Sequence, residues 1–301
     1  MRDVGDVNYW YVDHEVRKVK KEKGVEILQS REAYEKYAWV RKYFERKPRE
    51  GYFFWIKKST KIPLVSCISI SSKRLRQDLQ NLVVIEKGVR VSLRGTCNAL
   101  ASNLCSRHIA RGTLVLRENA SLDYAHLHSW GNRDRVSSHY EFILERDAKL
   151  RYVYNLINPP RRIEMSAKVK CSHRSSVDAK FVISSDNSNV KLQDEIELLG
   201  KDSSGIVSIR AVARNKSRIV ALSSIRAREE GRGHLDCRGL LLDDSASIEL
   251  IPKLIDENEK AILTHEASIG RISEEELNYL RARGISKKKA IELIVSGFLR
   301  I

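Results

Sequence analysis

The chain has 301 residues, of which 42% are hydrophobic, so it can bury a sizeable core and is not an intrinsically disordered chain. It contains no run of about 18 apolar residues, which argues against a membrane span, and its first residues lack an apolar secretion signal, so we expect a cytoplasmic protein. The net charge of +16 invites a nucleic-acid hypothesis, but Lys and Arg are mixed with 39 acidic residues along the whole chain, and we interpret the charge as a solvated surface.

The cysteines form an odd, widely spaced set without any CxxC pair. This pattern favours reduced thiols over a disulphide framework, and it encodes no zinc-ribbon or ferredoxin-type site. The five are Cys67, Cys97, Cys105, Cys171 and Cys237.

Residues 1–50 are strongly basic and carry a helical pattern. Ser30 is a suitable helix cap, and apolar side chains follow it at i, i+4, i+7 and i+11. The apolar positions are Ala33, Tyr37, Val40 and Phe44. We therefore predict a basic helical N-terminal segment that packs through this stripe.

From residue 51 to residue 262 the pattern changes to short alternating β-branched runs. Inward-type apolar positions recur at a nearly constant interval, first from Leu122 to Leu150 and later from Val190 to Ile219 and on to Ile248. A constant interval in a strand-rich region predicts a solenoid whose coils bury their inner faces on one another. A two-sheet sandwich could give similar alternation.

The pattern of residues 263–301 predicts a strand end followed by two short helices. Ser273 and Glu276 form a capping box, Gly284 suits a left-handed C-terminal cap, and Ser286 can cap the second helix. The inward stripe comprises Leu277, Leu280, Ile291, Ile294, Val295 and Phe298. Two such helices cannot build a core alone, so they must dock on the strand body or on another protein.

The segment from Leu263 to Ile272, continuing SEEELNYLRARGIS and ending IVSGFL, resembles the end of the SufB/SufD family of iron–sulphur cluster assembly scaffolds. The run GTCNALASNLCSRHIARGTLVLRENASLDYAHLHSW is similar to a strand region of the family, with His108 and Trp130 at the family's mutual spacing. The run HLDCRGLLLDDSASIELIPKLI looks like the strand that leads to the family's central proline. The resemblance covers residues 88–301.

This resemblance implies a mainly β protein with a right-handed parallel β-helix core, which pairs with a second copy or with a paralogous subunit. It implies that the helix pair, through the stripe listed above, binds a SufC-like ABC ATPase. The chain has no GxxxxGK[ST] loop, so ATP would act only through that partner. We expect a non-catalytic scaffold that receives sulphur and iron and builds a transient iron–sulphur cluster.

The resemblance also implies a cluster-assembly and metal-ligand set of Cys237, His265 and Glu266, with the thiol and the imidazole at the family spacing. Thiolate and imidazole are suitable iron ligands, and a carboxylate adds a hard ligand. Consecutive strand residues point to opposite faces, however, so His265 and Glu266 share one cavity only at a strand end or bulge. Thr264 stands where family members often have a second carboxylate, which leaves open a SufD-like subunit that supports assembly without holding the cluster.

Cys97 matches the family cysteine thought to accept sulphur from a donor protein. A nearby cation would favour its thiolate, and Arg94 and Arg107 are candidates by sequence. The resemblance implies a route for sulphur through the interior, from Cys97 past Trp130 and His128 towards Cys237. The family has Gln at the position of His128.

We interpret the remaining cysteines as structural, and the pairs His126/His128 and Cys171/His173 as coincidences of strand spacing. Two other functions remain as alternatives. A basic β-solenoid that binds nucleic acid would need aromatic and basic residues interleaved on one face, and the four Trp residues are not clustered that way. A hydrolase acting on acidic sugars would need an acid pair that the chain does not show.

Overall fold

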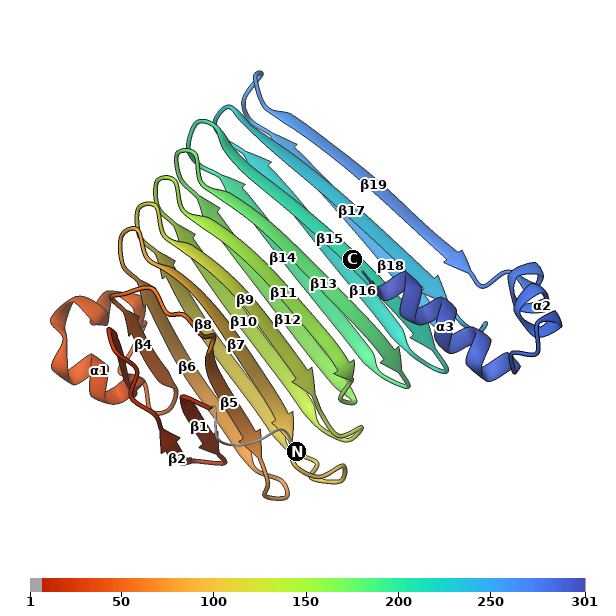
Figure 1. Cartoon of the computed structure of the whole chain (residues 1–301), viewed down its shortest axis with the longest axis horizontal. Helices are drawn as coiled ribbons and strands as arrows, with labels where there is room; N and C mark the ends of the chain where they lie inside the picture. The colour runs from red at the N-terminus through yellow and green to blue at the C-terminus, as the bar shows by residue number, and fades with distance from the viewer. Residues whose placement is uncertain (1–6, 301) are drawn as a thin grey trace.

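The computed structural model describes residues 7–300 and is built almost entirely of strands that stack in two parallel layers (Figure 1). From β4 onward the chain alternates between the two sheets, and each strand pairs with the second strand after it in sequence. This is the topology of a parallel β-helix, because every crossover moves to the opposite sheet before it returns one coil further along. The first sheet contains β1 (Tyr9–Val12), β2 (Glu15–Val19), β5 (Leu64–Ile70), β7 (Arg90–Ala99), β9 (Ser121–Ser129), β11 (Lys149–Asn158), β13 (Ser176–Asp186), β15 (Ser203–Arg214), β17 (Gly231–Leu241) and β19 (Ile262–Arg271). The second sheet contains β3 (Val25–Gln29), β4 (Tyr52–Ile56), β6 (Arg76–Ile85), β8 (Arg107–Leu116), β10 (Arg135–Leu144), β12 (Arg162–Cys171), β14 (Asn189–Leu198), β16 (Arg218–Ala227) and β18 (Ser247–Asp256).

The strand register confirms the solenoid predicted from the repeat. Leu122 pairs with Leu150 in parallel strands, and Val190, Ile219 and Ile248 form one continuous row across three strands. The repeat interval is therefore the length of one coil, and the sandwich alternative is wrong because the long strands are parallel to their neighbours.

At one corner, successive coils turn tightly through a residue whose backbone lies in the left-handed region. Asn119, Asp147, Arg174 and Asp202 all have positive φ, and the next residue in each turn is a small buried one. Asn and Asp tolerate this conformation because their short side chains can hydrogen-bond locally. A small side chain at every coil lets the corners stack directly on one another.

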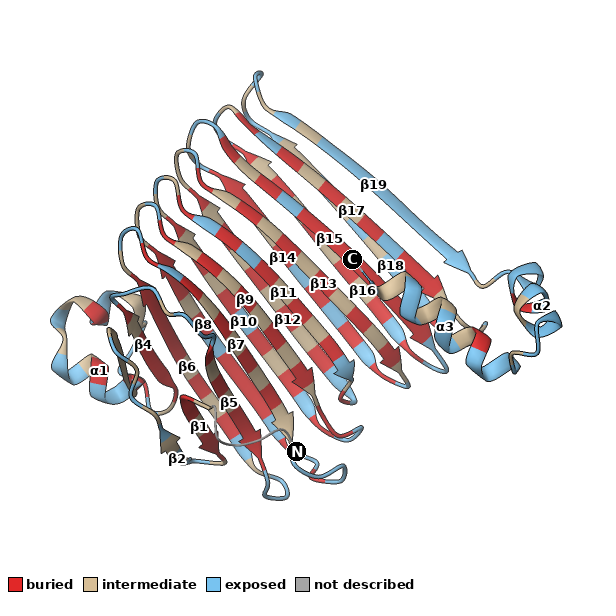
Figure 2. Ribbon diagram, in the orientation of Figure 1, coloured by how far each residue is buried: buried red, intermediate tan, exposed pale blue. Residues whose placement is uncertain are grey.

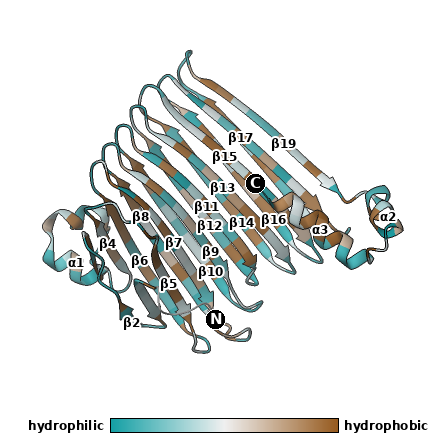
Figure 3. Cartoon of the chain, viewed as in Figure 1, coloured by the Kyte–Doolittle hydropathy of each residue, from teal (hydrophilic) through white to brown (hydrophobic). Residues whose placement is uncertain are grey.

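Side chains alternate between the interior and the surface along each strand (Figure 2), as a pleated strand requires. Strand β13, for example, alternates buried and half-buried residues along its whole length. The same alternation is visible as bands of opposite hydropathy in Figure 3. The core is a column of inward side chains between the two sheets.

The expected helical N-terminal segment is largely wrong. Within residues 7–50 the chain forms β1, β2 and β3, with helix only in α1 (Ser30–Lys36) and a short 3-10 helix (Ala38–Tyr43). Gln29, not Ser30, precedes the helix, and the Ser30 hydroxyl donates instead to the carbonyl of Gln80 at 2.5 Å. The antiparallel pairs β1–β2 and β3–β4, with α1, lie at this end of the solenoid (Figure 1).

The C-terminal region agrees with its prediction. Strand β19 leads into α2 (Glu274–Ala282) and α3 (Lys287–Leu299), and the hydroxyls of Ser273 and Ser286 accept hydrogen bonds from backbone N–H groups of the first turns. Gly284 has a φ of +81°, the left-handed conformation expected for a helix end. Helix α3 contacts β15 and α2 contacts α3, so the pair docks on the strand body through α3. No helix within residues 7–300 is both long and apolar enough to cross a bilayer.

Candidate functional site

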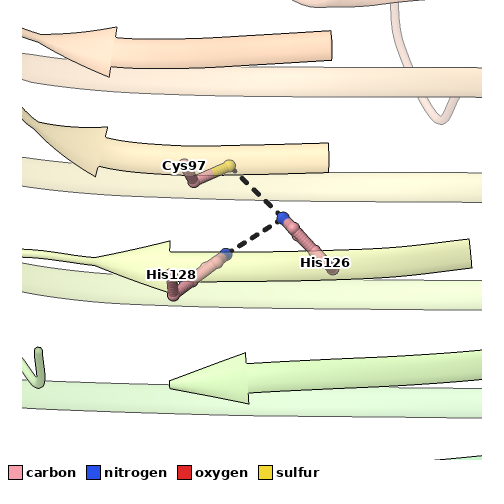
Figure 4. Close-up of side chains that lie close together, drawn as sticks. All are labelled: Cys97, His126 and His128. Atoms are coloured by element: carbon pink, nitrogen blue, oxygen red, sulfur yellow. Dashed lines mark hydrogen bonds between the residues drawn. The ribbon is translucent and has the colours of Figure 1, made fainter. Parts of the chain in front are cut away.

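A thiol and two imidazoles meet inside the first third of the solenoid (Figure 4). The Sγ atom of Cys97 lies 3.4 Å from Nε2 of His126, which lies 3.1 Å from Nε2 of His128. All three residues are buried. By sequence the two histidines are a coincidence of strand spacing, but the structure brings them together with the predicted sulphur acceptor.

The coil length explains this meeting. Strands β7 and β9 are parallel neighbours in which Cys97 pairs with His128 and Gly95 pairs with His126. A Cβ atom at Gly95 would lie 3.2 Å from the His126 ring and 2.8 Å from the hydroxyl of Tyr124. The missing side chain at Gly95 therefore leaves the space that the His126 imidazole fills.

Aromatic and amide groups surround the two histidines. The indole N–H of Trp130 donates to Nδ1 of His128 at 3.3 Å, and the Trp130 ring packs 4.7 Å from that of His108. Nδ1 of His108 and Oε1 of Gln77 are 2.8 Å apart, so the imidazole donates to the amide oxygen. These contacts fix the orientations of the His128, Trp130 and His108 rings.

Burial keeps these groups uncharged at neutral pH. Desolvation lowers the pKa of His126, and also that of His108, to about 3, and it lowers the pKa of His128 well below the usual value. Burial also raises the pKa of the Cys97 thiol well above its ordinary value. The ground state is therefore a neutral thiol beside neutral imidazoles.

The two arginines considered as activators of Cys97 do not approach it. Arg94 lies three positions before Cys97 on the same strand and so faces outward, where it pairs with Asp123 at 2.9 Å. Arg107 is exposed on β8. The expectation that they favour the Cys97 thiolate is wrong, because strand alternation turns Arg94 away from the thiol and Arg107 lies on the surface.

The predicted cluster site lies at the opposite end of the solenoid. Cys237 is buried on β17, and His265 on β19 pairs with Leu235, whose side chain points into the same interior. Cys237 and His265 therefore share the inward face, two positions apart along the strands. Glu266 pairs with Asp236 on the outer face, and its carboxylate lies 3.5 Å from Arg238. Within one chain, Glu266 is not brought to the face that holds Cys237 and His265.

A buried carboxyl that the sequence analysis missed lies in the same part of the interior. Asp194 on β14 points inward, and its Oδ2 accepts a hydrogen bond of 2.6 Å from the hydroxyl of Ser223. Its Oδ1 has no hydrogen-bond partner among the described residues. Burial raises the pKa of Asp194 to about 7, whereas burial and the charge of Asp194 raise the pKa of Cys237 to about 12. An isolated Asp in a strand gives no sequence signal, because its neighbours lie on other coils.

The interior between the two thiols is packed with side chains. His126, Tyr154, Phe181, Ile209 and Cys237 form one row through successive coils of the first sheet. Four strand spacings of about 4.8 Å place the ends of this row about 19 Å apart. Phe181 and Ile209 are buried in that row, so a sulphur atom moving along it would have to displace them.

A surface hollow of about 580 Å³ lies at the corner next to the histidines. Its lining includes Ala99, two residues after Cys97, and Trp130, whose other neighbours are His108 and His128. Trp130 therefore stands between the hollow and the buried imidazoles. A shift of this one ring would expose the imidazoles to the hollow.

The predicted ATPase-binding stripe is partly covered within the chain. Leu277 is buried, and the rest of the stripe is half-buried: Leu280, Ile291, Ile294, Val295 and Phe298. The large apolar side chains that the helix pair exposes are Tyr279 and Leu293, at 58% and 49%.

Comparison with known proteins agrees with this architecture. The family model described as SUF system FeS cluster assembly, SufBD core domain, matches residues 68–298. An iron–sulphur cluster assembly SufBD family protein of Archaeoglobus fulgidus is 28% identical over 92% of this chain and 80% of its own length. Proteins of the same description from Methanothermobacter thermautotrophicus and Pyrococcus horikoshii are 26% and 30% identical, over 91% and 83% of this chain and 73% and 57% of their own lengths.

The fold and the site define the class of protein, a parallel β-helix with buried thiols at Cys97 and Cys237 and a helix pair after its last strand. The chain belongs to the SufBD core family of the SUF iron–sulphur cluster assembly system. This membership confirms the resemblance and favours it over a nucleic-acid-binding function.

Proposed function

We propose that this chain is a scaffold subunit on which a nascent iron–sulphur cluster is built at an interface between two SufB/SufD-type chains. The observation that carries the proposal is the end of the solenoid at β19. There an exposed imidazole, His265, follows a buried thiol, Cys237, on the same inward face. A second chain covering this end would enclose both groups.

The last strands supply the surface for that second chain. β18 and β19 are the outer strands of their sheets, each ten residues long, and Ile262 and Ile269 on β19 are 57% and 45% exposed. Long unpaired edges bind other strands unless they are protected. The partner is a second copy of this chain or a paralogous subunit.

The helix pair would bind a SufC-like ABC ATPase through Tyr279 and Leu293, with the basic residues of the pair around them. Arg283 already lies over the Tyr279 ring at 4.5 Å, which leaves the opposite face of the ring for a partner. The scaffold itself catalyses no reaction in this proposal, and ATP acts through the ATPase.

Cys97 would accept sulphur from a donor persulphide. Its thiolate attacks the terminal sulphur, the donor thiolate leaves, and Cys97 becomes the persulphide, so atoms and electrons balance. His126 Nε2, 3.4 Å from Sγ, is the nearest basic atom, and it can take the thiol proton once His128 no longer donates to it.

Anaerobic reconstitution with iron and sulphide tests the cluster site. Replacing a soft ligand by a hydroxyl in Cys237→Ser should remove most of the visible iron–sulphur absorption. His265→Ala should lower it without changing the unfolding midpoint, because His265 is exposed. Cys171→Ser, which alters another buried thiol, is the matched control and should leave the absorption unchanged. Equal absorption in wild type and Cys237→Ser would refute the scaffold proposal.

Supplying sulphur from a donor protein tests the acceptor. Cys97→Ser should give normal clusters with inorganic sulphide and few with a donor persulphide protein. Cys105→Ser, at an exposed thiol in the loop after β7, is its control. Clusters that form equally well from both sources in Cys97→Ser would show that Cys97 accepts no sulphur.

Removing residues 273–301 leaves β19 whole and should abolish co-purification with the ATPase. The milder double change Tyr279→Ser and Leu293→Ser should weaken it while the helices remain folded. A complex that survives both changes would assign the ATPase to another surface.

The orientation of Glu266 supports a second candidate, a SufD-like subunit. Its carboxylate faces outward beside Arg238, and Thr264 offers no replacement on the inward face. Such a subunit would bind the ATPase and a SufB-like chain but hold no cluster when reconstituted alone.

A further inference from the structure

The interior group at Cys97 has the composition and spacing of a metal site. Its sulphur and two imidazole nitrogens all lie within 4.8 Å of one another, on two adjacent strands (Figure 4). We propose that Cys97, His126 and His128 bind one divalent ion of the Fe²⁺ or Zn²⁺ class inside the β-helix. This site is separate from the proposed cluster site at Cys237 and does not depend on it.

Two of the three ligand separations fit a common centre, and the third, between Cys97 Sγ and the ligand nitrogen of His128, is within 4.8 Å. Tetrahedral coordination with ordinary Zn–N and Zn–S bond lengths separates two nitrogens by about 3.4 Å and a nitrogen from a sulphur by about 3.6 Å. The corresponding separations are 3.1 Å between the two Nε2 atoms and 3.4 Å between Cys97 Sγ and His126 Nε2. An ion could be held by small outward movements of side chains that already converge.

The hydrogen bonds among these three side chains are poorly matched. Trp130 donates to Nδ1 of His128, so His128 carries its proton on Nε2 and donates it to Nε2 of His126. His126 then carries its proton on Nδ1, a buried atom without a partner among the described residues. Its single free lone pair is claimed by His128, so the Cys97 thiol has no good acceptor there. The N–H groups of Trp130 and His128 and the S–H of Cys97 therefore compete for two acceptors, Nδ1 of His128 and Nε2 of His126. A bound ion would replace this arrangement with three metal–ligand bonds.

A second polar group beside the site also lacks a partner. Tyr154 packs its ring 5.0 Å from that of His128 and 5.7 Å from that of His126. Its hydroxyl is buried without a hydrogen bond in the part of the chain that the structure describes. Buried polar groups are normally paired, so this hydroxyl points to a polar ligand at this place, whereas His126 Nδ1 lies across its ring from Nε2 and is not itself a ligand. An ion with three protein ligands keeps a fourth position for water or another small ligand.

Binding the ion requires one rearrangement. His128 must move its proton to Nδ1 to ligate through Nε2, and it then loses the hydrogen bond from Trp130. One neutral hydrogen bond corresponds to at most about a tenfold change in affinity. Trp130→Phe removes this competition and should tighten ion binding by up to about tenfold, an effect that a purely structural role of Trp130 would not produce.

Metal-free full-length protein, unfolded and refolded anaerobically with Co²⁺, tests the site and removes any barrier from burial. We expect one Co²⁺ per chain, with a thiolate-to-cobalt absorption band in the near ultraviolet and the intense visible bands of tetrahedral Co²⁺. Zn²⁺ and Fe²⁺ should displace it, whereas Mg²⁺ should not, because thiolate and imidazole select softer ions.

Variants identify the ligands. Cys97→Ser should abolish the thiolate band, and His128→Gln should weaken binding at least about 100-fold, beyond the cost of changing an outer-shell group. Cys171→Ser, at a buried thiol of β12 outside both proposed sites, should retain the band, and Cys237→Ser shows whether any of the band comes from the proposed cluster site instead. Circular dichroism of each variant checks that it has folded.

Failure of wild type to bind Co²⁺ after refolding, or persistence of the band in Cys97→Ser, would overturn the proposal. Loss of the band only in Cys237→Ser would overturn it too, while leaving the cluster site intact. The proposed sulphur acceptor uses the same thiol, so bound Zn²⁺ should slow donor-dependent sulphur transfer to the wild type.

Discussion

Replacing Asp194 by Asn isolates the electrostatic cost of one buried carboxyl. Burial raises its pKa from 3.8 to about 7, and the difference corresponds to about 4 kcal/mol at 1.36 kcal/mol per pH unit. Because the folded pKa is above the unfolded one, the folded chain holds a proton that the unfolded chain has released between about pH 4 and pH 7. The contribution of Asp194 to the free energy of unfolding is therefore fully present below about pH 4 and is lost as the pH rises through 7.

Asn has the size of Asp without its charge, and its amide can still hydrogen-bond Ser223. We expect Asp194→Asn to match the wild type near pH 4 and to exceed its free energy of unfolding at pH 8 by up to about 4 kcal/mol. Urea unfolding followed by far-ultraviolet circular dichroism at about pH 4, 6 and 8 measures this difference. Asp202→Asn, at an exposed position with a φ of +60° that suits Asn equally, controls for the loss of a carboxylate. A wild-type-to-variant difference that stays constant across this range would refute the reasoning.

Three further changes test the packing of the interior and one ion pair on the outer face. Gly112→Ala drives a Cβ atom into the ring of Tyr140 and should lower the free energy of unfolding, measured in urea, by about 1–3 kcal/mol. An unchanged urea midpoint would mean that the Tyr140 ring moves freely. Phe181→Ala opens the row between the two thiols and should cost about 3–5 kcal/mol, while speeding any sulphur transfer that runs through the interior. Arg210→Met removes the closest partner of Asp236, at 2.5 Å, and should lower the free energy of unfolding by on the order of 2–3 kcal/mol. The loss is smaller than for a fully buried ion pair because Asp236 keeps a second partner, Arg238. An unchanged thermal midpoint would contradict this.

The repeat and the capping residues were readable because each depends on local chemistry. The nearly constant interval between inward positions is one coil, as the pairing of Leu122 with Leu150 confirms. Ser273, Gly284 and Ser286 mark helix ends because their roles involve backbone groups only a few residues away. Strand alternation likewise predicted that His265 and Glu266 would face opposite ways.

The N-terminal segment shows where local patterns fail. Val25–Gln29 forms an edge strand because β4 supplies its partner, although the sequence before the short helix α1 was interpreted as helical. Pairing with a distant strand outweighs a helical stripe of a few residues, since propensity is a weak preference that tertiary context overrides.

The coil, the helix pair and the family could all be inferred from local sequence, whereas the contacts between side chains required the folded chain. The signal for the Cys97 group was present, because His128 lies one coil after Cys97 and His126 lies two residues before His128, but using it required the register. Asp194 approaches Cys237 across the interior from the other sheet, and no interval along the chain reports that contact. Local intervals set which residues face inward, but only the stacking of coils and the closure of two sheets set their neighbours.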